Sequence, residues 1–413
     1  MKIDYKWKML ALVSATYFLA QGTRQIYNAV LPQIKVSFAS SGLTDAQLGL
    51  VGSAFTLVFG LVIPLAGFAA DFFKRKWMIV LGALVFSTGI FLSGFAAGIG
   101  MLIFTYGILN AAGQSAMPPS ISSLIGQLHI STRATAFAIY QMTFYVGIVI
   151  LSSVSGWLSG LGEGKWRMAF WIFGAAGILW TFAVAALLKD TPQPVAASGD
   201  RPSFKEAVAA FFGKPTAVLL TFGVAFYVYS TYGFKTWVPM YLLRTFPDMT
   251  PAAAAFHAVF WYYLGAIGGV MAAGRISDRL RQRRRGIRLE TNVTGLLIAV
   301  PFILLATFTS SVPVMFAAIF GFGVATGIYD SNLYAALLDV VNPRYRAAAV
   351  GIYGFGANVL GSFGPAMCGW LNDRTSMRVS VASLAAFAVV GAVIILFARL
   401  VTFGRDAVAE TEG

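Results

Sequence analysis

The chain has 413 residues, of which 58% are hydrophobic and only 11% are charged, and its formal net charge is +14. Because a soluble domain has about 25% charged residues, this composition excludes an ordinary soluble protein. A single cysteine, Cys368, excludes an internal disulfide framework and a cysteine-based metal cluster.

The apolar residues gather in long stretches that predict transmembrane helices. Each stretch reaches or exceeds the ~20 residues that cross a bilayer, and only helices satisfy their own backbone groups in lipid over such a length. We therefore predict an all-α membrane protein with twelve transmembrane helices. The spans cover residues 9–31, 45–70, 77–97, 99–125, 133–159, 167–188, 215–243, 251–274, 290–309, 312–340, 346–371 and 378–402.

The first span follows a short basic head directly, without a small-residue cleavage pattern, so we interpret it as a retained helix and not as a signal peptide. Basic residues recur in alternate loops, as at Lys74–Lys76 after span two and Arg283–Arg285 after span eight. The positive-inside rule then predicts a multi-pass protein of the cytoplasmic membrane with both termini cytoplasmic. Since the basic runs join spans, we interpret them as orientation signals and expect no nucleic-acid partner.

The sequence locates the start of span two, a polar linker, and the start of a short helix within that linker. Thr44–Gln47 opens span two. The polar segment 189–214 predicts a cytoplasmic linker, in which Ser203–Glu206 forms a capping box for a short interfacial helix whose Phe204, Val208 and Phe211 face the membrane. This predicts an N-terminal six-helix half at 1–188, the linker at 189–214 and a C-terminal half at 215–413.

The two halves repeat each other in sequence. Arg133-Ala134 and Gly156-Trp157-Leu158 return 213 residues later as Arg346-Ala347 and Gly369-Trp370-Leu371. Pro32, Gly67 and Asp71 return 207 residues later as Pro239, Gly274 and Asp278. Such a duplication in an apolar chain is typical of a two-halved transporter, whose substrate site lies near the middle of the membrane.

Twelve spans, a central linker and a Gly-Asp-basic loop after spans two and eight resemble the major facilitator superfamily. The loop runs from Gly67 through Asp71 to Lys76 and returns from Gly274 through Asp278-Arg279 to Arg281. The resemblance implies gating roles for Asp71, Asp278 and Arg279, because a carboxylate at a helix end can pair with a base in one conformation only. The first copy departs from the family pattern at Phe72 and Lys74.

A narrower resemblance concerns spans one and seven. Arg24-Gln25-Ile26-Tyr27-Asn28 and the following residues to Pro32 are similar to the first helix of the organophosphate/phosphate antiporters and the anion:cation symporters. The resemblance implies that Arg24 binds the anionic group of the substrate. The Tyr-Gly and Trp-x-Pro elements of 231–239 are similar to the seventh helix of these families. The second arginine of the antiporters is missing at Thr231, and Lys235 stands one helical turn further on.

Polar stripes run along both of these spans. Tyr17, Gln21, Arg24 and Asn28 share one helix face, and Tyr227, Thr231 and Lys235 share another. By the repeat, Lys235 corresponds to Asn28, so the two stripes are predicted to line one cavity. Because a charge inside the bilayer costs at least ~2.5 kcal/mol, Arg24 and Lys235 are functional candidates, although either side chain can also extend to the headgroups.

Span ten carries the remaining intramembrane charge. Asp330 is the one acidic residue that we place well inside a span. A carboxylate that alternates between an apolar cavity and a nearby ammonium can bind and release a proton, which makes Asp330 a candidate for proton coupling. The alternative is a structural partner of Arg24 or Lys235.

Further polar residues lie in the middle of spans five and eleven. Gln141, Tyr353 and Asn358 can line a cavity or serve helix packing and interhelical hydrogen bonds. With Gln21, Tyr27, Asn28 and Thr231, they complete the candidate substrate-binding set around Arg24 and Lys235. No catalytic constellation, phosphate loop or metal-spaced histidine pair is present, so we expect no enzyme activity, cofactor or metal.

These features predict a secondary active transporter for a small organic anion, with a sugar acid as the best class, that works by alternating access with proton symport. The expected partners are this anion, protons and the lipid bilayer, and we expect a monomer. An organophosphate exchanger with the same arginine remains an alternative, as does a non-transporting sensor with a transporter fold. A multidrug exporter fits less well, because it would favour an acidic cavity.

Overall fold

The computed structural model describes residues 4–69, 73–190 and 204–408, and within these ranges it contains helices and no strand. Ten helical stretches among the described residues are long and apolar enough to cross a bilayer. Spans one and four lie outside these ten, because Gln21, Arg24 and Gln25 make the first more polar and the fourth is divided into short pieces. With them, the predicted all-α fold of twelve spans is confirmed.

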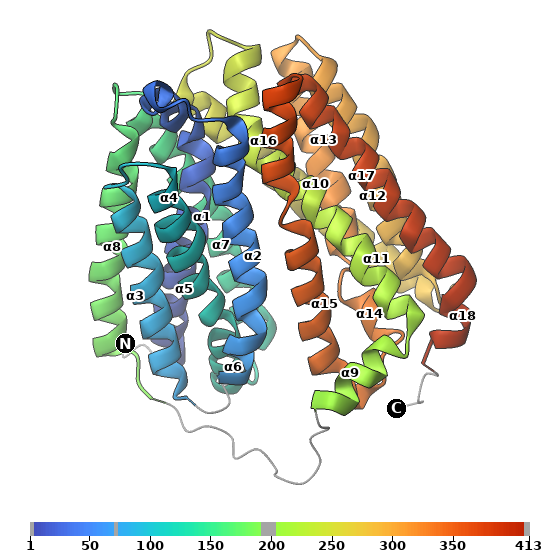
Figure 1. Cartoon of the computed structure of the whole chain (residues 1–413). Helices are drawn as coiled ribbons and strands as arrows, with labels where there is room; N and C mark the ends of the chain where they lie inside the picture. The colour runs from blue at the N-terminus through green and yellow to red at the C-terminus, as the bar shows by residue number, and fades with distance from the viewer. Residues whose placement is uncertain (1–3, 70–72, 191–203, 409–413) are drawn as a thin grey trace. The chain divides into compact units, whose positions relative to one another are not determined.

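Spans two to six begin and end within four residues of their predicted limits, whereas span one runs from Tyr5 to Ser37 and exceeds its predicted 9–31 at both ends (Figure 1). Span four continues from α4 through a π-helical stretch, Ile103–Asn110, into α5 and α6. The helices are α1 (Tyr5–Ser37), α2 (Asp45–Ala69), α3 (Arg75–Ser93), α4 (Ile99–Leu102), α5 (Ala111–Ala116), α6 (Pro118–Leu128), α7 (Arg133–Ser159) and α8 (Trp166–Leu187).

The last six spans follow a short helix, α9 (Phe204–Phe212). Span ten consists of α13 and α14, span eleven of α15 and α16, and span twelve of α17 and α18 with a π-helical turn between them. The helices are α10 (Pro215–Thr245), α11 (Pro251–Arg281), α12 (Ile287–Phe308), α13 (Val312–Asp330), α14 (Ala335–Leu338), α15 (Arg346–Gly361), α16 (Gly364–Arg374), α17 (Met377–Phe397) and α18 (Phe403–Asp406).

The chain forms two compact units. The first comprises Met1–Pro194 with Lys235–Val259, and the second comprises Val195–Phe234 with Phe260–Gly413. The division therefore passes through α10 and α11, and the adjoining ends of these helices belong to the first unit. There Gly156 of α7 meets α11 so closely that a Cβ on it would lie 2.6 Å from the Ala255 Cβ.

Small residues allow close helix contacts in the second unit, where α11 packs on α13. A Cβ added at Gly323 would lie 2.1 Å from the Tyr262 carbonyl oxygen, and one at Gly327 would lie 2.2 Å from the Ala266 carbonyl oxygen. Glycine is needed at both positions because backbone atoms cannot yield as side chains do. These contacts fix the end of α13, which carries Asp330.

Spans four, ten and eleven are interrupted, although the sequence predicts each as one continuous helix. Met117 separates α5 from α6, where Pro118 and Pro119 follow, and a similar break before Pro365 separates α15 from α16. Proline lacks the N–H that would continue a helix. In span ten, α13 ends at Asp330. Ser331 Oγ donates to the Ile328 carbonyl at 2.7 Å, so a side-chain hydroxyl competes with backbone N–H groups for a carbonyl of the helix.

The short helix α9 packs differently from its prediction. Phe211 is 2% exposed and belongs to the core of the second unit with Leu220, Tyr353 and Ile395. The sequence predicts that Phe211 faces the membrane. An amphipathic face is satisfied equally by lipid and by a protein core, and here the contact with α15 buries it.

Candidate functional site

Arg24 of α1 lies against two aromatic rings of α2. Its guanidinium carbon is 4.7 Å from the ring centroids of both Phe55 and Phe59. The two rings are nearly parallel, with centroids 5.9 Å apart and an interplanar angle of 16°. Arg24 is half-buried, so the rings attract and orient the cation while part of the side chain remains accessible.

Three polar residues of span four hold the backbone of α1 beside Arg24. Tyr106 Oη donates to the Arg24 carbonyl oxygen. Gln114 Nε2 donates to the Ala20 carbonyl at 2.7 Å and to Asn110 Oδ1 at 2.8 Å. Sequence reasoning missed this row, although buried polar residues spaced four apart in an apolar span are a detectable signal.

The other candidates of the first unit lie in different surroundings. Tyr27 is completely buried, and its hydroxyl donates to the Leu48 carbonyl at 2.7 Å, so the ring packs inside the unit. Gln21 is 5% exposed, and its Oε1 has no hydrogen-bond partner among the described residues. Half-buried Asn28 donates through Nδ2 to Gln25 Oε1 at 2.8 Å, while Gln141 on α7 is exposed.

Asp45, at the start of α2, is a buried carboxylate that binds two bases. Its Oδ1 pairs with the Lys35 ammonium, and its Oδ2 lies 3.4 Å from Arg244 Nη1 of α10. The sequence predicts only a helix start at Thr44–Gln47, which the reciprocal bonds between Thr44 and Gln47 confirm. The charge cluster was missed because Lys35 and Arg244 are far apart in sequence.

Lys235 is half-buried in α10, at the point where the chain passes from the second unit to the first. Its flanking residues Phe234, Thr236 and Trp237 are all buried. The predicted cavity shared with Arg24 stays a prediction.

Asp330 lies at the interruption of span ten, where it is the last residue of α13. Tyr227 Oη of α10 donates to its Oδ1 at 2.7 Å. The Tyr227 ring stacks on Tyr329, with centroids 4.1 Å apart and an interplanar angle of 12°. Asp330 is nevertheless exposed.

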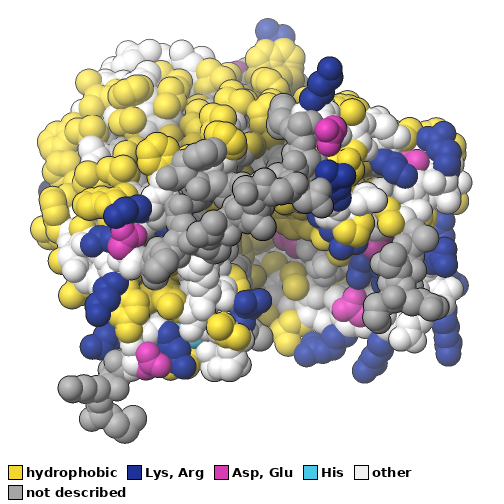
Figure 2. All heavy atoms as spheres, turned by 90° about the horizontal axis from the view of Figure 1, so that it is seen from below, with side chains coloured by type: hydrophobic (Ala, Val, Ile, Leu, Met, Phe, Trp, Pro, Cys, Tyr) yellow, Lys and Arg dark blue, Asp and Glu magenta, His cyan; other side chains and the backbone are white. Residues whose placement is uncertain are grey.

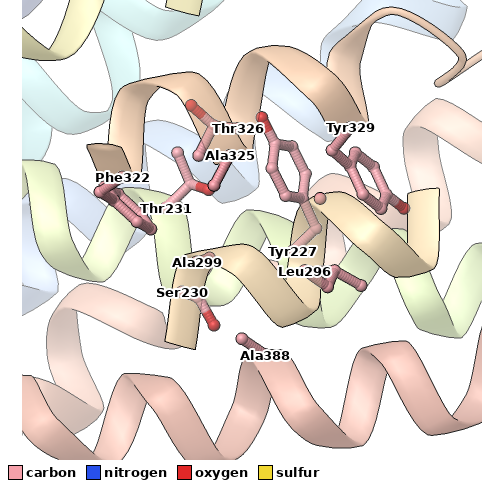
Figure 3. A pocket seen from close by; sticks show the side chains of 11 residues that line it. Tyr227, Ser230, Thr231, Leu296, Ala299, Phe322, Ala325, Thr326, Tyr329 and Ala388 are labelled. Atoms are coloured by element: carbon pink, nitrogen blue, oxygen red, sulfur yellow. The ribbon is translucent and has the colours of Figure 1, made fainter. Parts of the chain in front are cut away.

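A small cavity lies beside these tyrosines, among α10, α12, α13 and α17 (Figure 3). Its volume is about 10 Å³, which is room for roughly one water molecule. Thr231 lines it, is 3% exposed, and has a hydroxyl without a hydrogen-bond partner among the described residues. The cavity is too small for an organic anion.

The two remaining candidates, both in span eleven, are largely occupied by packing. Tyr353 is 1% exposed and forms part of the core of the second unit. Asn358 is half-buried and donates through Nδ2 to the Gly354 carbonyl at 2.8 Å, a bond within its own helix.

The predicted gating residues are only partly described. Asp71 lies outside the described residues. Asp278 and Arg279 are exposed, and Arg288 Nη2 lies 3.7 Å from Asp278 Oδ1. The stronger partner of Arg288 is Asp339, whose Oδ1 is 2.7 Å from Arg288 Nη1 and also pairs with Arg281. Sequence reasoning missed Asp339.

Basic side chains gather on the face that Figure 2 presents. In the second unit, Arg279, Arg283 and Arg285 at the connection between α11 and α12 are all exposed. Among the described residues, no group of three or more His, Cys, Asp or Glu residues is placed to hold a metal ion.

Comparison with known proteins places this fold among transporters. The sequence model of the Major Facilitator Superfamily matches residues 13–291 and 286–412. A probable sulfoacetate transporter of Cupriavidus necator is 27% identical over 91% of this chain and 89% of its own length. The hexuronate transporter of Bacillus subtilis is 24% identical over 81% of each chain.

Further similarities are weaker in sequence and strong in fold. A probable hexose phosphate transport protein of Chlamydia trachomatis is 22% identical over 72% of this chain and 71% of its own. The crystal structure of a bacterial homologue of the human lysosomal transporter Spinster, inward-facing and unoccupied, superimposes with a TM-score of 0.84 and 23% identity. It covers 99% of this chain and 100% of the other.

Proposed function

Because this chain belongs to the Major Facilitator Superfamily, a family of multi-pass membrane transporters, we propose that it carries a small organic anion by alternating access. A sugar acid is the substrate class that we favour. The proposal includes proton symport, with Asp330 as the proton carrier and Arg24 as the anion anchor.

The observation that carries the proposal is the setting of Arg24. Its guanidinium lies against Phe55 and Phe59, and its backbone carbonyl accepts a hydrogen bond from Tyr106. A half-buried arginine held in this way presents a planar donor edge, which suits a carboxylate better than a flexible ammonium does. The relatives support a small organic anion, since they include a probable sulfoacetate transporter and a hexuronate transporter, and a hexuronate is a sugar acid.

An organophosphate exchanger is the second candidate, supported by the similarity to a hexose phosphate transport protein. It would use the same Arg24 without a coupled proton. Lys235, in place of a second arginine, favours the singly charged carboxylate over a phosphate dianion, because an ammonium cannot form the bidentate contact of a guanidinium. If the protein exchanges one anion for another at a rate that does not depend on a proton gradient, the organophosphate exchanger is favoured over the symporter.

The remaining parts of the proposal concern topology. We propose a monomer in the cytoplasmic membrane with both termini cytoplasmic, a first half at 1–188, a linker at 189–214 and a second half at 215–413. The exposed arginines between α11 and α12 support this orientation, because cytoplasmic loops carry an excess of basic residues.

The test is ligand binding to the purified protein in detergent, measured as thermal stabilisation by sugar acids, sulfoacetate and hexose phosphates. A ligand at 100 times its Kd adds about 2.7 kcal/mol to the free energy of unfolding. We expect a sugar acid to stabilise the wild type and Arg378→Ala, which changes an exposed arginine at the start of α17, but not Arg24→Ala or Arg24→Lys. Undiminished stabilisation of Arg24→Ala would remove Arg24 as the anchor.

A further inference from the structure

Several tyrosines of the second unit lie near the end of α13 that carries Asp330. Tyr227 hydrogen-bonds its carboxylate and stacks on Tyr329, and the Tyr334 ring meets Tyr353 edge to face, with centroids 6.1 Å apart. Tyr334 follows Asp330 by four residues, in the turn between α13 and α14. We call the four residues Tyr227, Tyr329, Tyr334 and Tyr353 the tyrosine frame; they come from α10, α13, α15 and the turn after α13.

The frame has a buried part and an accessible part. Tyr227, Tyr329 and Tyr353 are 8% exposed or less, so they hold the frame in place. Asp330 is exposed, and Tyr334 is 47% exposed. The accessible edge therefore consists of the Asp330 carboxyl group and the Tyr334 phenol, four residues apart. Both lie at the break in span ten, between the end of α13 and the start of α14. Broken helices in transporters typically form binding sites.

The chemistry of this edge suits hydroxyl groups. A carboxyl group accepts hydrogen bonds from two hydroxyls when ionised and still donates and accepts when protonated. The Tyr334 hydroxyl can do both and has no hydrogen bond with any other described residue. An aromatic face packs against the C–H face of a sugar, while its hydroxyl reaches a polar partner.

We propose that Asp330 and Tyr334, held by Tyr227, bind the hydroxyl groups of a polyhydroxylated anion and so select sugar acids over anions that lack hydroxyls. The inference rests on the proposed function, since it assigns the hydroxyl-bearing part of the same substrate. It gives Asp330 a contact with the ligand in addition to the proposed proton.

The experiment compares two anions on the purified full-length protein: a hexuronate, which carries several hydroxyls, and sulfoacetate, which carries none. Tyr334→Phe and Asp330→Asn should each weaken hexuronate binding about tenfold, because hydrogen bonds between ligand and site are lost. Sulfoacetate binding should change less than twofold in both. Tyr229→Phe is the matched control, since Tyr229 is buried on α10 against Phe387, with centroids 4.2 Å apart.

The outcomes separate this inference from the proposed function. Equal losses for both anions, or no loss for either in Tyr334→Phe and Asp330→Asn, overturn the hydroxyl subsite. A selective hexuronate loss in these variants supports it even if Arg24→Ala binds normally, in which case only the proposed anchor fails. If the wild type binds neither anion, both the sugar-acid function and the subsite are refuted.

Discussion

At the residue scale, the chain shows how an arginine can be kept in an apolar helix. Insertion of a lone charge costs at least ~2.5 kcal/mol, and the two rings beside Arg24 recover part of that cost without neutralising the cation. A carboxylate neighbour would do so more strongly but would compete with an anionic ligand. The two phenylalanine rings carry no charge of their own, so they stabilise the guanidinium without competing with an anionic ligand.

The ring contact predicts a specific effect of Phe59→Leu. Leucine preserves apolar volume but has no ring face, so the guanidinium loses orientation and roughly 0.5–1 kcal/mol of attraction. We expect the affinity for the transported anion to fall about two- to fivefold, measured by calorimetry in detergent. Phe104→Leu, at a residue 53% exposed on span four, is the control. Equal affinities in both variants would mean that the rings only pack.

A second residue-scale prediction concerns Asp45. Asp45→Asn removes the anion that holds Lys35 and Arg244, so two cations remain without their shared partner. We expect a loss of about 1–3 kcal/mol in stability, because the carboxylate is 3% exposed while its partners retain some hydration. Thermal unfolding measures the loss.

The same change should loosen the segment 235–259 within the first unit. A reporter introduced as Ala255→Cys, in a Cys368→Ala background, faces Gly156 and is shielded. Thiol labelling of this cysteine should become faster in Asp45→Asn. A labelling rate that stays the same would show that the ion cluster does not hold α11 in place.

At the element scale, the breaks in spans four and ten reflect the internal repeat. Asp330 lies 213 residues after Met117, and the helix is broken at both positions. The duplication therefore preserves a backbone feature while the residues differ. The break in span four follows from Pro118 and Pro119, whereas span ten reaches it with short polar side chains, which makes the second break hard to predict from sequence.

Glycine contacts give a prediction at this scale. Gly327→Ala places a Cβ about 2.2 Å from the Ala266 carbonyl oxygen, which must shift α13 away from α11. Overpacking of this kind typically costs about 1–3 kcal/mol, so the melting temperature should fall by several degrees. Gly351→Ala has open space around its Cβ and should be neutral or slightly stabilising. Equal melting temperatures for the two variants would contradict the packing argument.

These elements also show what could be predicted from sequence. Hydropathy places all twelve spans, because long apolar runs are a strong signal, and Arg24 stands out as a charge within one of them. Phe55 and Phe59 could not be singled out, since phenylalanine in an apolar helix carries no information about its neighbour. The pairing of Asp45 with Arg244, and the position of Asp330 at an exposed helix end, depend on tertiary contacts between distant segments.

At the scale of the whole molecule, the repeated halves carry different charges. The first half has Arg24 where the second has Thr231, and the second has Asp330 where the first has Met117. Symmetric folds with such unequal polar residues can bind one asymmetric ligand and one ion, because each half contributes a different group. The proposed coupling assigns the anion to Arg24 and the proton to Asp330.

Asp330→Asn tests this assignment in the intact transporter reconstituted into liposomes. A symporter needs at least one group that changes its charge during the cycle, and asparagine cannot do so. We expect the variant to lose accumulation of the anion driven by a pH gradient, while counterflow exchange persists, because exchange does not require the release of the proton. Since the variant is also expected to bind hexuronate more weakly, exchange is measured at saturating substrate.

Asp248→Asn, at an exposed loop carboxylate, should accumulate substrate normally. If Asp330→Asn still concentrates the anion along a proton gradient, this carboxylate is not the proton carrier.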